Sequence, residues 1–296
     1  MLTSRRINQI RAADDWSLDC TERWWGVRRH GCWLALAVSW ACLAAPPDAR
    51  EIIQRSVAAN EADWQEAPRY SYLEREVQSK HDSAGTIKTY EVLMIDGSPY
   101  NKLIANNDHP LSPGERAVED QKLREEIEKR ERESSRERAR RMAKYLKERN
   151  QDRAMMNEMA EAFDYTLAGE EKLDDRDVWL LDATPKPGYQ PKSHETKVLL
   201  GMKGKLWVDK ATYQWVKVDA QVVKPVSLFG FFAKVGPGTR FVLEQEPVSA
   251  NLWLPKYFSV KVNATALGFI NQNSAEEDTY RDYRPMPKAV AALGTR

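Results

Sequence analysis

The stretch from Met202 to Gly268 decides the fold class, because it contains four segments in which apolar and polar residues alternate. These segments read MKGKLWVDK (202–210), QWVKVDAQV (214–222), TRFVLEQEP (239–247) and LWLPKYFSVKV (252–262). Alternation with a period of two places successive side chains on opposite faces of a strand. The pattern therefore predicts strands with one packed and one solvated face, which is typical of an antiparallel sheet.

The same alternation assigns residues to the packed faces of two of these segments. In the second segment the expected packed face holds Val216, Val218, Ala220 and Val222. In the fourth segment it holds Phe258, Val260, Val262 and Ala264. Lysine, aspartate, serine, asparagine and glutamine occupy the opposite positions. We expect this stretch to form one wall of a larger sheet.

The composition is that of a sizeable globular chain without a dominant charge. Of 296 residues, 42% are hydrophobic and 30% are charged, yet the formal net charge is only +1. A chain of this length suits one large β domain or two smaller ones. Because the chain as a whole has no basic field, we expect no nucleic-acid partner.

The N-terminal part has the layout of a secretory signal peptide. Val27-Arg28-Arg29-His30 is a basic segment, Gly31–Ala45 is an apolar run, and Pro46-Pro47 ends it. The run is too short to span a membrane as a helix. We expect cleavage after Ala44 and export to the periplasm. The preceding polar extension is unusually long, so we hypothesise that translation starts at Val27 rather than Met1; N-terminal sequencing of the precursor would test this.

All three cysteines, Cys20, Cys32 and Cys42, precede Ala45. A processed chain would then carry no thiol for a disulfide, a metal site or a nucleophile. Cys42 lies at the end of the apolar run, where bacterial lipoproteins are acylated. The residues before it lack the expected leucine and include the bulky Trp40, so we do not expect a lipid anchor there.

Helix and hairpin signals precede the opening stretch in the chain. Asp48 followed by Glu51 forms a capping-box pattern, and the apolar residues after it predict a short helix that ends near Asn60. Strands are expected at 69–80, 86–95 and 98–105. Asp96-Gly97 lies between the last two and is the strongest hairpin signal, because a type I′ turn needs positive φ.

The segment 112–163 breaks the alternating pattern. Ser112-Pro113-Gly114-Glu115 is a further capping box, and 25 of the 39 residues from Glu115 to Arg153 are charged. We expect a long, solvated, coiled-coil-like charged helix supported by ion pairs between residues four apart, with Met155, Met159 and Phe163 docking on the body. Three functional interpretations remain open: a nucleic-acid arm, a partner-binding lever and a contact with an anionic membrane surface. Mixed charge disfavours the first.

Strands resume after this segment and set the expected architecture. Strands are predicted at 165–173 and 177–184, joined by a further hairpin at Asp174-Asp175-Arg176, and finally at 272–283. This gives about ten strands with those above. We expect an α+β, mainly β fold: a curved antiparallel half-barrel with an N-terminal helix and a long charged helical insertion. The expected organisation is an extension with signal peptide (1–45), a single β domain (46–285) containing the insertion (112–163), and a tail (286–296).

Motifs for catalysis and metal binding are missing from the sequence. His194-Glu195 lacks the second histidine of a zinc-protease helix, and His81, His109 and His194 have no ligand spacing. There is also no nucleophile elbow, Walker motif or dinucleotide fingerprint. Acidic residues on expected strands, Glu170, Glu171, Glu244 and Glu246, would serve an acid/base pair only if the fold brought them together. We therefore expect no enzyme, no catalytic residue, no cofactor and no metal.

The order of several strand motifs resembles one known group. The segments are GKLWVDK (204–210), WVKV (215–218), GTRFVLEQ (238–245), LWLP (252–255) and YRDY (280–283). They resemble the outer-membrane lipoprotein-sorting-protein-like group, the LolA/LolB-like superfamily, over residues 49–283. The resemblance implies a strongly curved antiparallel half-barrel whose concave apolar face is lidded by helices and holds acyl chains. The charged helix departs from the carrier pattern, and no lid-latching arginine can be assigned.

The leading hypothesis from the sequence is a periplasmic, non-enzymatic protein that binds a lipid or lipoprotein acyl chain and is related to outer-membrane lipoprotein sorting. Apolar burial would drive binding. The candidate cavity residues are Val216, Val218, Phe241, Leu243, Phe258, Val260 and Val262, and the candidate lid residues are Leu228, Phe229, Phe231 and Phe232. The alternative is an envelope-stress sensor or scaffold that engages an envelope protein partner through the charged helix.

Overall fold

The computed structural model of the chain describes residues 47–80, 85–228, 233–266, 270–271 and 273–286. The expected signal peptide, its cysteines and the candidate lid residues Phe229, Phe231 and Phe232 lie outside the described residues. Among the described residues, no helix is both long and apolar enough to cross a membrane.

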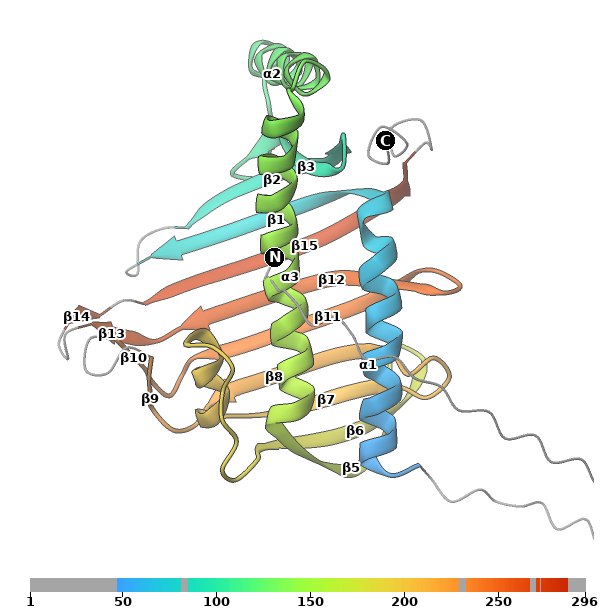
Figure 1. Cartoon of the computed structure of the whole chain (residues 1–296), viewed down its shortest axis with the longest axis vertical. Coiled ribbons are helices and arrows are strands. Elements are labelled where there is room, and N and C mark those ends of the chain that lie inside the picture. The colour runs from blue at the N-terminus through green and yellow to red at the C-terminus, as the bar shows by residue number, and fades with distance from the viewer. Residues whose placement is uncertain (1–46, 81–84, 229–232, 267–269, 272, 287–296) are drawn as a thin grey trace, which may run out of the picture. The chain divides into compact units, whose positions relative to one another are not determined.

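Eleven strands form the main sheet, in which every pairing is antiparallel (Figure 1). In spatial order they are β4 (His109–Pro110), β3 (Ser98–Asn106), β2 (Thr86–Ile95), β1 (Tyr70–Lys80), β15 (Ser274–Pro285), β12 (Leu252–Val262), β11 (Arg240–Ser249), β8 (Trp215–Val222), β7 (Met202–Asp209), β6 (Arg176–Pro185) and β5 (Phe163–Leu173). The sheet is an open half-barrel that ends at β4 and β5, so the expected fold class is confirmed. The four strands of the opening stretch, β7, β8, β11 and β12, are neighbours in the sheet, as the alternation predicted.

Two connections explain why more strands are present than the sequence predicted. Four short strands form a second antiparallel sheet: β9 (Val226–Ser227), β10 (Ala233–Val235), β13 (Ala264–Ala266) and β14 (Ile270–Asn271). They lie in the links between β8 and β11 and between β12 and β15, where the sequence has no long alternating run.

The last strand, β15, inserts between β1 and β12, so the two halves of the sheet are joined by a pairing of residues about 200 positions apart.

The tight turns follow the backbone preferences of their residues. Asp96 and Gly97 have φ values of 45° and 85°, the positive values that a type I′ hairpin needs between β2 and β3. Asp174 and Asp175 adopt φ values of 49° and 62° between β5 and β6. Both hairpins are where the sequence placed them.

Helix α1 (Ala49–Glu66) begins as predicted and extends further than predicted. The Asp48 side chain accepts a hydrogen bond from the Glu51 amide at 2.8 Å. The helix continues past Asn60 to Glu66 and passes into the short 3₁₀ helix η1 (Ala67–Arg69). It continues because polar residues of its last turns are buried against the protein, a contact that apolar periodicity does not show.

The charged segment forms two helices, where the sequence predicted one. Helix α2 (Pro113–Glu131) and helix α3 (Ser135–Ala162) each begin with a complete capping box, Ser112 with Glu115 and Ser134 with Glu137. The second box satisfies amides at a new helix start, so the chain changes direction between the helices (Figure 1).

Arginine side chains fix the charged segment to the sheet where apolar residues are lacking. Arg130 is 7% exposed and donates to the carbonyls of Ile95 and Ser98 at 2.6 and 2.8 Å. Arg141 pairs with Asp96 at 2.8 Å and with Glu133 at 2.7 Å. The middle of the segment is therefore docked on the β2–β3 hairpin through hydrogen bonds, and is not a wholly solvated helix as the sequence analysis expected.

Helices α1 and α3 pack on one side of the main sheet, here called the helix-facing side (Figure 1). The largest apolar cluster joins Ile52 and Ile53 of α1 to the sheet residues Leu181, Leu206 and Val218, with Met156 and Met159 of α3 against it. The indole nitrogen of Trp215 donates to the fully buried Ser56 hydroxyl at 3.0 Å and so anchors α1. Met155, Met159 and Phe163 also pack on the body, as expected.

Candidate functional site

The helix-facing side contains one row of side chains that changes from apolar to acidic across the sheet. Directly opposed residues of antiparallel strands share a face, so the registers define the row. From β6 to β2 it consists of Leu181, Leu206, Val218, Leu243, Phe258, Asp278, Glu76 and Lys88. The change occurs between β12 and β15, where Phe258 is opposite Asp278. A neighbouring row makes the same change, from Val260 on β12 to Glu276 on β15.

The apolar half of these rows brings together most of the predicted cavity residues. Val218 is buried, and Phe241 and Leu243 are half-buried and pack against the core. The Phe241 and Phe258 rings meet edge to face with centroids 5.5 Å apart. Val260 and Val262 continue the same face of β12 and are half-buried. Leu228, the one lid candidate among the described residues, packs beside a neighbouring core cluster.

Val216 does not share this face with Val218. A register irregularity between β7 and β8 places two residues of β8 where regular alternation allows one. As a result Trp215 joins Val218 in the cluster under the helices, whereas Val216 packs with Val178 and Trp253 in a separate cluster. Period-two alternation alone gives no sign of such a bulge.

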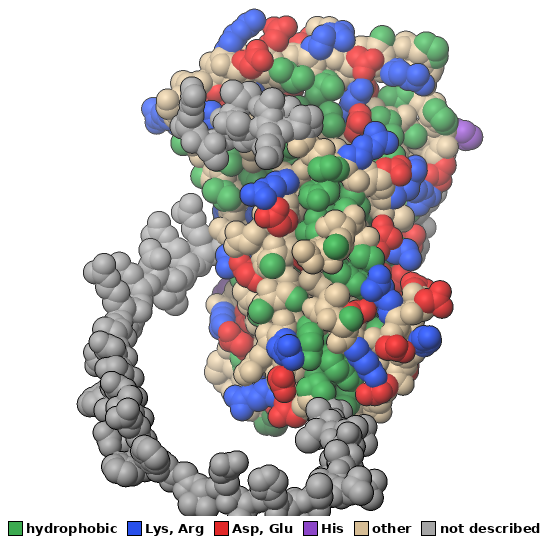
Figure 2. All heavy atoms as spheres, turned by 90° about the vertical axis from the view of Figure 1, so that its right-hand side faces the viewer, with side chains coloured by type: hydrophobic (Ala, Val, Ile, Leu, Met, Phe, Trp, Pro, Cys, Tyr) green, Lys and Arg blue, Asp and Glu red, His purple; other side chains and the backbone are tan. Residues whose placement is uncertain are grey.

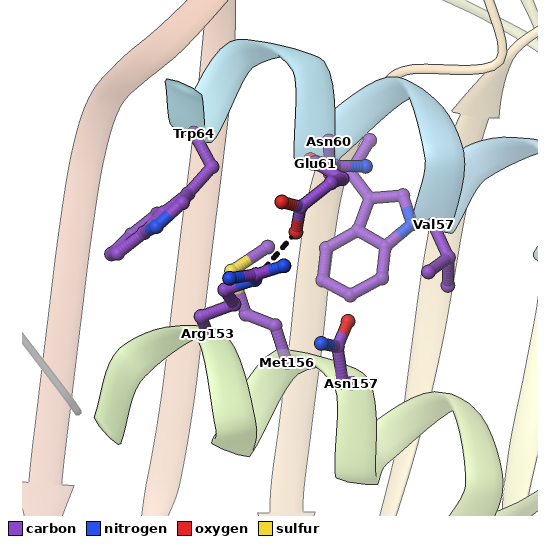
Figure 3. Close-up of a pocket in the computed structure, with 8 residues that line it drawn as sticks. Val57, Asn60, Glu61, Trp64, Arg153, Met156 and Asn157 are labelled. Atoms are coloured by element: carbon purple, nitrogen blue, oxygen red, sulfur yellow. Dashed lines mark hydrogen bonds and ion pairs between the residues drawn. The ribbon is translucent and has the colours of Figure 1, made fainter. Parts of the chain in front are cut away.

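The enclosed space between the two covering helices is small (Figure 3). The part enclosed against the sheet, where Trp215 joins residues of α1 and α3 in the lining, measures about 20 Å³. A more open groove of about 420 Å³ between the same helices is lined by residues of α1 and α3 alone. Glu61 of α1 and Arg153 of α3 face one another across it and pair at 2.6 Å (Figure 3). The enclosed part suits about one water molecule. With the helices in this position, the apolar rows are covered where α1 and α3 pack on them, whereas the row residues of β11 and β12 stay half-buried.

The acidic half consists of four carboxylates on two paired strands: Glu74 and Glu76 on β1, and Glu276 and Asp278 on β15. We call this group the acidic cluster. Asp278 is directly opposite Glu76 and is only 4% exposed. The hydroxyl of Tyr280 donates to Oδ2 of Asp278 at 3.4 Å. The other carboxylate oxygen of Asp278, Oδ1, has no partner in the described part of the chain.

Burial and mutual repulsion favour the neutral forms of these acids. Burial, with repulsion from Glu276 and Glu74, raises the pKa of Asp278 to about 7. Burial and the neighbouring Glu76 raise the pKa of Glu74 to about 7. The pKa of Glu76 is also raised, by burial and by Glu276. The acidic cluster therefore changes its charge near neutral pH.

Three tyrosines surround the acidic cluster. The Tyr72 ring lies 5.9 Å from that of Tyr280 and 5.3 Å from that of Tyr283, centroid to centroid. Tyr283 is held by a hydrogen bond from its hydroxyl to the Pro255 carbonyl at 2.6 Å. Sequence reasoning missed this group. The signal was present, because Tyr72, Glu74 and Glu76 share one face of β1 by period two, as Glu276, Asp278 and Tyr280 do on β15.

The acidic residues that the sequence offered as a possible acid/base pair lie on strands that are not neighbours in the sheet. Glu170 on β5 pairs with Lys210, and Glu244 on β11 pairs with Lys217 at 2.7 Å. Three strands, β6, β7 and β8, separate their strands in the sheet, so they form no acid/base pair. Over the described ranges, no group of three or more His, Cys, Asp or Glu is arranged to hold a metal ion.

The fold defines a class of protein: an open antiparallel half-barrel with helices across one side of the sheet. No protein-family model matches the chain, and no curated protein matches it. Solved structures do resemble it. A LolA superfamily protein from Nitrosomonas europaea is 13% identical, with a TM-score of 0.31, and the match covers 83% of this chain and 97% of that one.

Two further solved structures are similar over comparable lengths. A domain from Vibrio parahaemolyticus, described as an outer membrane lipoprotein-sorting protein, is 12% identical with a TM-score of 0.31, covering 78% of this chain and 92% of that one. The MucA/MucB complex from Pseudomonas aeruginosa gives 13% identity and a TM-score of 0.24, covering 80% and 99%. These likenesses to LolA-like and MucB structures are at low identity and concern the fold alone.

Proposed function

We propose that the protein is a periplasmic, non-enzymatic binding protein that holds a lipid or lipoprotein acyl chain against the helix-facing side of its sheet. The supporting observation is the continuity of the apolar rows across β6, β7, β8, β11 and β12. On β11 and β12 the residues of these rows, such as Leu243 and Val260, are only half-buried. Apolar surface on these two strands is therefore still exposed, and an acyl chain would cover it.

Apolar burial supplies the driving force. At about 0.8 kcal/mol per buried CH₂, a twelve-carbon chain gains roughly 10 kcal/mol before the costs of association. Ligand pockets measure about 300–1,000 Å³, whereas the space enclosed between the helices and Trp215 of the sheet is about 20 Å³. The open groove of about 420 Å³ between the same helices has no sheet residue in its lining, so it gives no access to the apolar rows. Binding therefore requires α1 or α3 to move away from the sheet, and these helices act as the lid.

A polar substitution on the apolar row tests the proposal. We expect Val260→Asn to weaken binding of dodecyl maltoside about tenfold, because contacts with about two CH₂ groups are lost. Ser259→Asn is the matched control: it is the neighbouring residue on β12, and its side chain points to the opposite face. Affinity is measured by calorimetry below the micelle concentration, and mass spectrometry of the purified protein identifies any bound lipid. Equal affinities of the two variants would contradict the proposed surface.

A second candidate function uses the outer face of α3. Arg136, Arg140, Lys144 and Lys147 are exposed and follow one another at helical spacing of four, four and three residues. This basic stripe suits an acidic envelope protein partner, as in a stress sensor or scaffold, or an anionic membrane surface. Elsewhere on the surface, as Figure 2 shows for one face, basic, acidic and hydrophobic side chains are interspersed.

Charge reversal separates the two candidates. Removing residues 115–153 would not separate them, because this range includes the buried residues Arg130 and Tyr145. We instead expect Arg136→Glu combined with Arg140→Glu to abolish capture of an acidic partner, or binding to anionic vesicles, while dodecyl maltoside binding stays unchanged. Retained capture by this variant would exclude the basic stripe as the contact surface.

A further inference from the structure

The acidic cluster gathers one buried and three half-buried carboxylates with few cationic groups opposite them. Its four carboxylates lie on adjacent strands, with Glu76 directly opposite Asp278. Asp278 is more than nine-tenths buried, and its Oδ1 has no hydrogen-bond partner among the described residues. Buried polar atoms are almost always paired in folded proteins, so an unpaired carboxylate oxygen directed into an acidic group points to an absent partner.

The cationic groups that face the cluster are few. On the β2 side, Lys88 is opposite Glu76, and Tyr90 is opposite Glu74. On the α3 side, Arg149 and Tyr145 lie near Tyr72. The Arg149 guanidinium is engaged elsewhere, because it stacks 4.2 Å from the centroid of the Trp64 ring and donates to the Trp64 carbonyl.

The walls of the cluster fit an organic cation better than a metal ion. The rings of Tyr72, Tyr280 and Tyr283 meet beside the acids, and aromatic faces attract ammonium groups. The described acids do not converge as metal ligands do. An ammonium group needs diffuse negative charge and aromatic contact, and the cluster provides both.

The position of the cluster connects it to the apolar rows. Phe258 is directly opposite Asp278, and Val260 is directly opposite Glu276, on the paired strands β12 and β15. A ligand with its charge among the acids therefore has an apolar surface immediately beside it. This is the layout of a site for an amphiphile, with separate places for the head and the chain.

We propose that the acidic cluster and its three tyrosines bind the cationic ammonium headgroup of an amphiphile whose chain lies on the neighbouring apolar rows. This inference rests on the proposed function and specifies the chemical class of its ligand. The cation balances the charge of Asp278 and Glu76, and the tyrosine rings contact its methyl or methylene groups. The chain takes the place that α1 and α3 now cover.

A set of ligands with one chain and four headgroups tests the proposal. Binding of dodecyltrimethylammonium, dodecylammonium, dodecyl maltoside and dodecyl sulfate is measured at pH 8 by calorimetry below their micelle concentrations. We expect both ammonium ligands to bind at least tenfold more tightly than the maltoside, and the sulfate to bind most weakly. Tetramethylammonium, the headgroup without a chain, should bind at least a hundredfold more weakly than dodecyltrimethylammonium.

Substitutions then assign the preference to the cluster. Asp278→Asn and Glu74→Gln should each remove most of the preference for ammonium over maltoside and leave maltoside affinity unchanged. Glu277→Gln is the matched control, because Glu277 is exposed and is the neighbour of Asp278 on β15, on the opposite face. It should keep the full preference.

The outcomes distinguish this inference from the proposed function. If no dodecyl ligand binds, the proposed function itself fails. Equal affinity for all four headgroups leaves the proposed function standing and overturns the headgroup assignment. Tetramethylammonium binding as tightly as the chain-bearing cation would also overturn it, because the ligand would then be a free cation. An unchanged preference in Asp278→Asn would place the selectivity elsewhere.

Discussion

Replacing Asp278 by asparagine should make the stability of the protein less dependent on pH. The carboxyl group is 4% exposed, and its pKa is raised from 3.8 to about 7 by burial and by the neighbouring acids. Because the folded state holds the proton more tightly than the unfolded chain, this group favours folding at low pH. That contribution is lost progressively as the pH rises from 3.8 through 7. Asparagine has the same shape and does not titrate.

The magnitude follows from the pKa shift. One pKa unit corresponds to about 1.4 kcal/mol of free energy. For a shift from 3.8 to about 7, ionisation costs about 2 kcal/mol at pH 5.5 and about 4 kcal/mol at pH 8. The wild-type protein should thus lose about 2 kcal/mol more stability than Asp278→Asn over this interval. For a domain of this size, that corresponds to a difference of about 4–8 °C in Tm.

The assay is urea unfolding, followed by circular dichroism, of the wild type and two variants at pH 5.5 and pH 8. Glu277→Gln removes a carboxyl from the exposed face of the same strand and should behave as the wild type does. Removing the Asp278 charge also lessens repulsion on Glu74, and this acts in the same direction. If the wild type and Asp278→Asn lose equal stability between the two pH values, Asp278 does not titrate as a buried acid and the reasoning is refuted.

Other contacts give further predictions, each checked by urea unfolding or calorimetry. Ser56→Ala should cost about 1–3 kcal/mol, because the buried Trp215 indole nitrogen loses its acceptor; an unchanged midpoint would show that water replaces it. Arg130→Met should destabilise by about 1–3 kcal/mol more than Arg132→Met, since Arg130, unlike the exposed Arg132, donates to carbonyl groups of the β2–β3 hairpin, that of Ile95 among them. Equal losses would contradict docking through arginine. Dodecyltrimethylammonium should bind roughly 30-fold more weakly at pH 5.5 than at pH 8, because a carboxyl with a pKa of about 7 is mostly neutral at the lower pH. Affinity independent of pH would exclude the acids as its partners.

Local patterns were sufficient to predict the parts of the fold that depend on near neighbours. Period-two alternation located β7, β8, β11 and β12. Turn-forming residues located the hairpins at Asp96-Gly97 and Asp174-Asp175, where the structure has positive φ. The capping box at Ser112 marked the start of α2. In each case the deciding interaction lies within a few residues, so the sequence records it directly.

Features that depend on distant residues were not predictable in the same way. Helix α1 is anchored by contacts such as that of Ser56 with Trp215, 159 residues further along the chain, and its last turns bury the polar residues Asn60 and Asp63. The arginines of the charged segment resembled solvated residues, because the carbonyls that bind them belong to a hairpin 30 or more positions earlier. Likewise, Glu76 and Asp278 become neighbours only because β15 pairs with β1. The acidic cluster is therefore a product of topology.

The closed arrangement of α1 and α3 leads to a last prediction, on how the hydrocarbon chain of a ligand reaches the apolar rows. If binding requires these helices to separate, a covalent link between them should prevent it. Glu61 and Arg153 form an ion pair across the gap at 2.6 Å, so cysteines at both positions can be joined by a short, reducible bismaleimide. We expect the linked protein to lose dodecyl maltoside binding and to regain it on reduction.

The control applies the same reagent within one helix. Cysteines in place of Arg136 and Arg140, which are exposed and one turn apart on α3, become linked without joining α3 to α1. Both variants are made in a chain whose native cysteines are replaced by serine, so the link forms only at the intended sites. Loss of binding in the α1–α3 link alone would establish that the helices must separate. Undiminished binding in that protein would mean that the chain reaches the β11–β12 surface from outside the helices, and that they are a fixed cover for the core.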